Sequence, residues 1–141
     1  MTIKQISLFL ENKFGRLGEL LSILGQADVH IVSAMVADTN DYGILRLITT
    51  DQMKAYQVLK DNGVLVTMKE VVAIDINPLA ADFATAIGLF TRRGINIEYM
   101  YCFNFAARLV LVMSCSDMEA VREVVRDNNL SFITETDLMR M

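Results

Sequence analysis

The chain has 141 residues, a formal net charge of −4 and a sequence pI near 4.9. This acidic balance argues against a nucleic-acid-binding surface, because such surfaces concentrate Lys and Arg. Apolar residues make up 53% of the sequence and charged residues 21%, yet no apolar run approaches the roughly 18 residues that span a bilayer. These totals predict a folded, cytoplasmic protein that binds neither nucleic acid nor membrane and covers apolar surface by forming a homo-oligomer, expected to be a dimer.

An internal repeat with a constant offset of 66 residues organises the chain. Asp51, Val58 and Asp61 recur as Asp117, Val124 and Asp127. Each copy is longer than a solenoid repeat, which indicates a small folded unit rather than one turn of an array. We therefore expect two similar domains, residues 1–69 and 70–141.

The first copy begins with a strand in which Ile6, Leu8 and Leu10 alternate, followed by a loop at residues 12–15 and an amphipathic helix from Leu17 to Leu24. Residues 29–37 and 44–50 predict two strands joined by a connection rich in turn formers. A second helix begins with Thr50 or Asp51 as its cap and ends at Asn62-Gly63, and residues 64–68 predict a last strand.

The second copy repeats this order, with the expected elements at residues 71–76, 80–93, 95–103, 108–115, 117–128 and 130–134. Ser116-Asp117-Met118-Glu119 has the pattern of a capping box, in which Glu119 reaches back to the amide of the cap residue. The order βαββαβ predicts an α+β fold of two tandem ferredoxin-like units, eight strands in all, with antiparallel sheets and the helices on one face.

Strands 29–37 and 95–103 are apolar at both sets of alternating positions, so period-2 reasoning predicts cover on both faces of each strand. Cys102 and Cys115 lie in such strands and are expected to be reduced thiols without chemistry. The sequence shows no catalytic constellation, no phosphate loop and no metal-ligand cluster, so we expect no cofactor and no metal.

The segments Glu11–Leu21 and Ala27–Ile31 resemble the opening strand, loop and helix of ACT domains, and Gly94–Ile97 resembles the family's turn into the second strand. The resemblance covers the whole chain as two tandem domains. Two positions depart from the family pattern: Phe14 stands where the family has Pro, and Ala80-Ala81 stands where Pro-Gly would fall.

The resemblance implies that a free amino acid binds at the seam between the two domains. It assigns a ligand site to Asn12, Lys13, Phe14, Gly15, Arg16 and Leu17 of the first copy with Ile95, Asn96 and Ile97 of the second, and a weaker site to His30, Asn77, Leu79 and Ala81. Backbone amides at a helix start would hold the ligand carboxylate, and Asn12 and Asn96 would meet its ammonium group. Gly15 and Asn12 are equally compatible with plain turn roles.

Three functions are compatible with these features. The first is a non-catalytic sensor that binds a free amino acid and regulates a partner enzyme or regulator. The second is an interaction module that binds another protein on its apolar sheet face and takes no small ligand. The third is an enzyme, which would need Glu11, Asp28 or Glu98 as a base, although nothing in the sequence orients one of them.

Overall fold

The structure, a computed structural model, describes residues 2–11, 13–38 and 42–141. The chain folds into two compact units, each of which holds most of one copy of the repeat. The N-terminal unit comprises Lys4–Lys69 with Glu135–Met141, and the C-terminal unit comprises the segment that ends at Ile3 with Glu70–Thr134.

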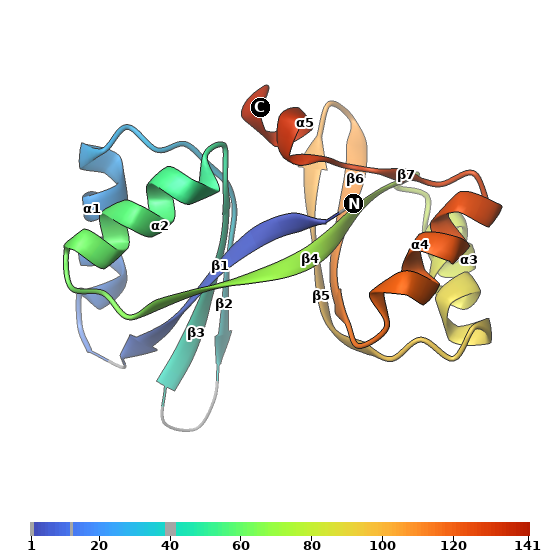
Figure 1. Cartoon of the computed structure of the whole chain (residues 1–141), viewed down its shortest axis with the longest axis horizontal. Helices are drawn as coiled ribbons and strands as arrows, with labels where there is room; N and C mark the ends of the chain where they lie inside the picture. The colour runs from blue at the N-terminus through green and yellow to red at the C-terminus, as the bar shows by residue number, and fades with distance from the viewer. Residues whose placement is uncertain (1, 12, 39–41) are drawn as a thin grey trace. The chain divides into compact units, whose positions relative to one another are not determined.

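The N-terminal unit is a sheet with two helices on one side (Figure 1). Its strands lie in the order β2-β3-β1-β4, and its core packs Leu20 and Leu24 of the first helix and Leu59 of the second against the strands. The elements are β1 (Ile3–Glu11), α1 (Arg16–Gln26), β2 (Ile31–Asp38), β3 (Tyr42–Thr49), α2 (Gln52–Asp61) and the first part of β4 (Val66–Ile76).

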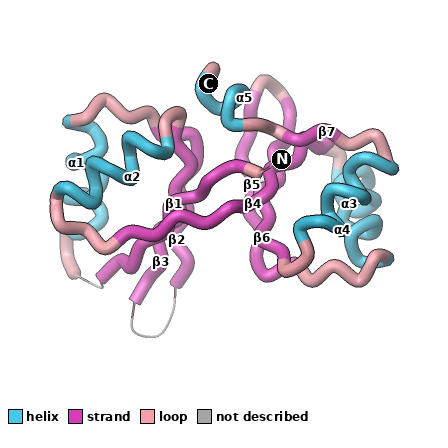
Figure 2. The backbone as a smooth tube through the Cα atoms, viewed as in Figure 1, coloured by secondary structure: helices cyan, strands magenta, loops and turns pink. Residues whose placement is uncertain are grey.

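The C-terminal unit repeats this arrangement, with β6 between β4 and β5 and the short β7 on the other side of β4 (Figure 2). Phe90 of the first helix and Val121 of the second pack against the strand residues Ile74 and Leu111. The elements are α3 (Ala80–Arg92), β5 (Ile97–Phe105), β6 (Arg108–Cys115), α4 (Met118–Asp127) and β7 (Ser131–Phe132). The expected α+β fold of two ferredoxin-like units is confirmed.

Two sequence predictions about element boundaries are wrong. The strands expected at 64–68 and 71–76 are one continuous strand, β4, because the two residues between them, Lys69 and Glu70, are not turn formers; seven strands are described instead of eight. The cap of α4 is Asp117, whose carboxylate accepts from the Ala120 amide at 3.1 Å, whereas Glu119 pairs with Arg122.

The helices end on residues in the left-handed conformation, as the Asn62-Gly63 pattern predicts. Gly63 and Gly94 have φ of 75° and 68°, and the repeat places Asn129 and Asp28 at the matching positions with φ of 56° and 58°. In each unit, one helix is therefore followed by a glycine in the left-handed conformation. The other helix is followed by Asp or Asn, whose side chain makes a positive φ less favourable.

A fifth helix, α5 (Glu135–Met139), belongs to the N-terminal unit, although the repeat places its residues in the second copy. Glu135 accepts a hydrogen bond from the Lys4 amide at 2.7 Å, and Leu138 is fully buried. Each compact unit therefore includes a terminal segment that a division between residues 69 and 70 would assign to the other unit. The domain bounds 1–69 and 70–141 stay a prediction based on the repeat.

Within the single chain, the edge strands are not covered on both faces, so cover by a second copy stays a prediction. Val36 of β2 is 47% exposed and Met100 of β5 is 37% exposed, and both lie on the helix side of their sheets, opposite Leu45 and Met113. The cores draw on the inner strands, so edge residues extend beyond the helices. On the inner strands the helix-free face is buried, since Val71, Ala73, Val110 and Val112 have no exposed surface.

Candidate functional site

The start of α1 offers backbone donors without a side-chain cap. Its N-cap is Gly15, with φ of 81° and no side chain to accept from the first amides. The helices α2 and α4 are capped by the carboxylates of Asp51 and Asp117, whereas α3, like α1, has no side-chain cap. The first helix of each unit, the one that follows the predicted ligand loop, therefore lacks the carboxylate cap of the second, although the Arg16 amide of α1 donates to the Lys13 carbonyl at 3.1 Å.

The backbone at this helix start is accessible. A Cβ atom built on Gly15 or on Gly18 would meet no atom within 4 Å. Lys13 is exposed and Phe14 is fully exposed, so neither side chain folds over the loop. A ligand carboxylate can therefore approach the first turn closely.

Arg16 supplies a further donor beside these amides. Its side chain is 24% exposed; one terminal nitrogen donates to Glu19 Oε2 at 3.1 Å, and its Nε lies 3.8 Å from Glu11 Oε1, beyond hydrogen-bond distance. The Nε atom is buried and has no hydrogen-bond partner among the residues that the structure describes. Such a donor is a cost to the fold unless a ligand or water accepts from it.

The other predicted group begins the second strand of the C-terminal unit. Gly94 in the left-handed conformation turns the chain, and the Ile95 amide donates to the Phe90 carbonyl at 3.1 Å. Ile95 is buried, Ile97 is half-buried and Asn96 is exposed, so Asn96 is the polar side chain of this group that a ligand can reach.

Within one unit, the loop and the start of the second strand lie at opposite ends of the sheet. Glu11, which leads into the loop, pairs with Tyr42, whereas Ile31 at the start of β2 pairs with Thr49 at the far end of the same strand. The C-terminal unit has the same register, with Ile76 opposite Leu109 and Ile97 opposite Cys115. A site that uses both groups therefore needs two units, as the seam hypothesis requires.

The weaker site differs from the first in its local structure. Asn77 Oδ1 accepts from the Leu79 amide at 3.1 Å, which closes the loop on itself. The helix α3 begins at Ala80, so Ala81 lies in its first turn and not in the loop position that the repeat gives it opposite Gly15. His30 is exposed, with its Nε2 3.8 Å from Asp28 Oδ1.

Several residues of interest are not singled out by sequence reasoning. The sequence does not indicate the open space at Gly18. The i,i+3 spacing of Arg16 and Glu19 could have predicted the ion pair between them. Asn12, which heads the predicted ligand group, lies outside the described residues. Among the described residues, no group of three His, Cys, Asp or Glu side chains is arranged to hold a metal, and no helix is long and apolar enough to cross a membrane.

Comparison with known proteins identifies the family of the chain. A family model described as "ACT domain pair" matches residues 1–141, so the chain belongs to the ACT domain family as a domain pair. A crystal structure of protein BT0572 from Bacteroides thetaiotaomicron is 35% identical, with a TM-score of 0.93 and coverage of 100% of this chain and 98% of that one. No curated protein matches the sequence.

More distant structures share the fold. The ligand-free regulatory subunit of aspartate kinase from Thermus thermophilus has a TM-score of 0.62 at 13% identity, covering 88% of this chain and 91% of that one. Aspartokinase III from E. coli, in complex with lysine and aspartate, has a TM-score of 0.50 at 14% identity, covering 89% of this chain and 31% of that one. These two structures therefore share the fold of this chain.

Proposed function

We propose that this protein is a non-catalytic sensor that binds a free amino acid and regulates a partner enzyme or regulator. The observation that carries the proposal is the uncapped start of α1, where Gly15 and Gly18 leave the backbone open and Arg16 Nε lacks an acceptor among the described residues. A carboxylate placed there would accept from backbone amides, and the Arg16 side chain would have to turn its buried Nε outward to donate to the same ligand.

The ligand's ammonium group would be met from the other domain. In the proposed site the loop at residues 12–17 faces the second-strand start at 95–97, and the exposed Asn96 accepts from the ammonium through its side-chain oxygen. The register is compatible with this proposal, because the two groups stand at opposite ends of the sheet within one unit, so that a single unit does not supply both. The aspartokinase III structure named above contains two amino acids, which supports this class of ligand.

A thermal-shift screen with the twenty amino acids tests the proposal. A ligand present at one hundred times its dissociation constant is expected to stabilise the fold by about 2.7 kcal/mol. If no amino acid shifts the midpoint at millimolar concentration, the sensor proposal fails.

Two matched glycine variants locate the site. Gly18→Ala and Gly25→Ala place a methyl group in open space at the two ends of α1, and each is expected to stabilise the helix by about 0.5–1 kcal/mol. Gly18→Ala is expected to weaken ligand binding about tenfold, because the added methyl group would hold the carboxylate away from a backbone amide and prevent one charge-assisted hydrogen bond. Gly25→Ala is expected to leave the affinity unchanged. Equal affinities by calorimetry would place the ligand elsewhere. Gly15 is less suitable, because its φ of 81° strains any other side chain.

A second candidate function is the interaction module. Phe9 and Tyr42 form an edge-to-face pair with ring centroids 5.0 Å apart on the helix-free side, and both remain substantially exposed. If the screen finds no ligand, Phe9→Ser on the full chain tests this alternative by its effect on capture of the regulated partner.

A further inference from the structure

A β-bulge distorts the start of β5, next to the residues that the proposed site takes from the C-terminal unit. Ile97 lies opposite Cys115 and Tyr99 lies opposite Ser114, so the register shifts between them. The residue within the bulge is Glu98, whose side chain is exposed. Bulges are common beside functional sites, where the extra residue changes the direction of a side chain. Glu98 therefore departs from the simple alternation of the strand.

A buried hydroxyl holds the carboxylate of Glu98 in place. Ser114 of β6 is fully buried, and its Oγ donates to Glu98 Oε1 at 2.7 Å. This distance is typical of a hydroxyl that donates to a carboxylate. An ionised carboxylate has about four acceptor positions, so the hydrogen bond from Ser114 does not use its whole capacity. The pair therefore combines a fixed direction with the ability to accept from a further donor.

The first copy of the repeat shows that the bulge does not require this polar pair. The strand β2 has the same register shift near its start. The residues that match Glu98 and Ser114 there are Val32 and Ile48, both of which are apolar. Replacing both partners of a hydrogen bond by apolar groups can be nearly neutral for stability. The two copies therefore differ in both partners at once, and stability alone does not account for the polar pair of the second copy.

The charge of an ammonium group accounts for a carboxylate at this place. In the proposed function, Asn96 meets the ammonium group of the ligand, and Glu98 follows two residues later. An ammonium group has three donors and a positive charge, whereas the side-chain oxygen of Asn96 is a neutral acceptor. A charge that leaves water on binding is costly unless it is paired. Glu98 is the one charged residue of β5 and can provide that pairing.

We propose that Glu98 is the anionic residue of the amino-acid site and accepts from the ammonium group of the ligand, with Ser114 as a positioning residue that holds its carboxylate. This inference rests on the proposed sensor function and defines the class of ligand more closely. The ligand keeps a free ammonium group beside its carboxylate, and an α-hydroxy acid of the same shape binds more weakly. The weaker site has Val32 at the matching position and lacks this charge.

The variant Glu98→Gln removes the charge and keeps an oxygen that can accept from Ser114. Glu119→Gln is the matched control, because Glu119 is an exposed carboxylate on α4 of the same unit. Both variants and the wild type are screened by thermal shift with the twenty amino acids. For each amino acid that stabilises the wild type, Glu98→Gln is expected to need an at least about tenfold higher concentration for the same shift, and Glu119→Gln the same concentration.

The outcomes of this screen separate the inference from the proposed function. If the wild type responds and Glu98→Gln responds equally, the role of Glu98 is overturned and the sensor function stands. If no amino acid stabilises the wild type, both are overturned. Circular dichroism checks that each variant is folded.

The α-hydroxy acids that correspond to the responding amino acids, such as L-lactate for L-alanine, test the same contact from the ligand side. By calorimetry, the wild type is expected to bind the amino acid at least about tenfold more tightly than the hydroxy acid, and Glu98→Gln is expected to lose most of that preference. Damage to the fold alone would weaken both ligands equally. A wild type that binds both equally, or a Glu98→Gln protein that keeps the full preference, refutes the role of Glu98.

The positioning role of Ser114 is tested by Ser114→Ala. The carboxylate of Glu98 remains in this variant but is no longer held, so the affinity for the amino acid is expected to fall less than in Glu98→Gln, and part of the preference over the hydroxy acid is kept. Wild-type affinity and preference in a folded Ser114→Ala protein would show that Ser114 does not position Glu98.

Discussion

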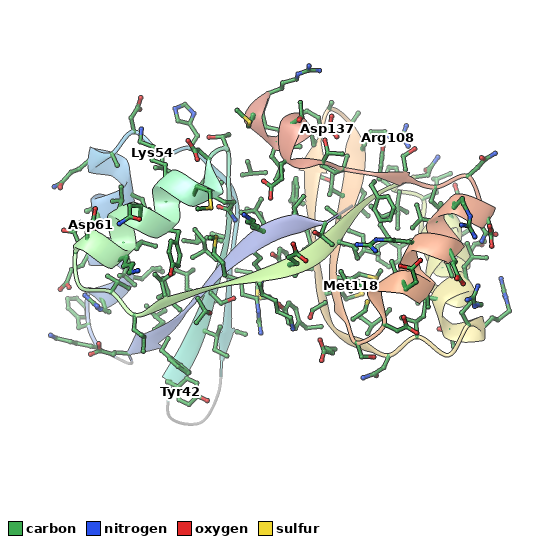
Figure 3. All side chains as sticks on the ribbon, in the orientation of Figure 1. Tyr42, Lys54, Asp61, Arg108, Met118 and Asp137 are labelled. Atoms are coloured by element: carbon green, nitrogen blue, oxygen red, sulfur yellow. The ribbon has the colours of Figure 1, made fainter. Side chains whose placement is uncertain are left out.

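The two copies of the repeat have different kinds of side-chain contact at one matching pair of positions. In the N-terminal unit, Phe9 packs edge-to-face on Tyr42; 66 residues later, Asp75 Oδ1 lies 2.9 Å from Arg108 Nε. Figure 3 shows Tyr42 at the start of β3 and Arg108 at the start of β6. The same pair of backbone positions therefore accommodates either an aromatic pair or an ion pair. The fold does not depend on which of the two is present.

A second contrast concerns the first residue of the second helix. Gln52 is buried, and its amide makes four hydrogen bonds: Oε1 accepts from the Thr49 amide and hydroxyl at 2.9 and 2.6 Å, and Nε2 donates to the Lys4 and Leu47 carbonyls at 2.7 and 2.8 Å. The matching residue of the C-terminal unit is Met118, which packs against the core. A buried hydrogen-bond network at the start of α2 therefore corresponds to an apolar contact at the start of α4.

The largest expected effect on stability comes from replacing Gln52 of the N-terminal unit by methionine, the residue at the matching position of the C-terminal unit. Gln52→Met removes the partners of several buried polar groups and is expected to lower the free energy of unfolding by about 3 kcal/mol. The control Met118→Leu conserves volume and is expected to cost less than about 1.5 kcal/mol. Urea unfolding of both variants makes the comparison, and equal losses would show that the hydrogen-bonded junction contributes nothing specific.

Ligand occupancy is expected to be unequal. The site that uses Gly15 and Asn96 should bind at least about tenfold more tightly, a difference of about 1.4 kcal/mol, than the site that uses His30 and residues 77–81. The reason is that Asn77 already accepts from the Leu79 amide and that the first turn of α3 begins with Ala80 and Ala81, which have a side-chain methyl group where Gly15 has none. Calorimetry that shows two equal, independent sites in each chain contradicts this prediction.

The ion pair is expected to have a smaller effect. Arg108→Ala leaves the Asp75 carboxylate, whose side chain is 22% exposed, without its partner and should cost about 1 kcal/mol, less at high salt. The double variant Asp75→Phe with Arg108→Tyr installs the pair of the other unit and should recover most of that loss. A double variant less stable than Arg108→Ala would show that the two surfaces are not interchangeable.

The smallest effect is expected at the helix ends. Asp28→Gly, which copies Gly94, relieves a left-handed φ and should raise the stability by about 0.5–1 kcal/mol; Gly94→Asp should lower it by a similar amount. Thermal unfolding of the two reciprocal variants measures the difference, and shifts of the same sign in both would refute the conformational explanation.

The sequence predicts the regular elements of both units because their periodicity and caps are local properties. It does not predict α5, since the residues 66 positions earlier, Lys69–Ala73, form part of β4. The same repeat position is a strand in one copy and a helix in the other, so tertiary contacts decide its state. Alternation likewise predicts which side chains share a face, but it cannot tell that β2 and β5 stand at the edges.

The candidate site shows the same division between local and tertiary information. Local sequence predicts the loop and its glycine, and the uncapped start of α1 lies where the motif indicates. The unpaired donor at Arg16 Nε, within the described part of the chain, and the open space at Gly18 depend on how neighbouring side chains fold around the helix. The joining of the two residue groups at a seam stays a prediction.

The exchange of chain ends has a consequence for synthesis on the ribosome. The N-terminal unit includes Glu135–Met141, with Glu135 bound to the Lys4 amide and Leu138 buried. This unit therefore cannot make its full set of contacts when residue 69 emerges; it must wait until almost the entire second copy has been translated. The order of synthesis and the order of completion are therefore reversed, and during that interval the nascent first unit lacks the contacts of Glu135 and Leu138.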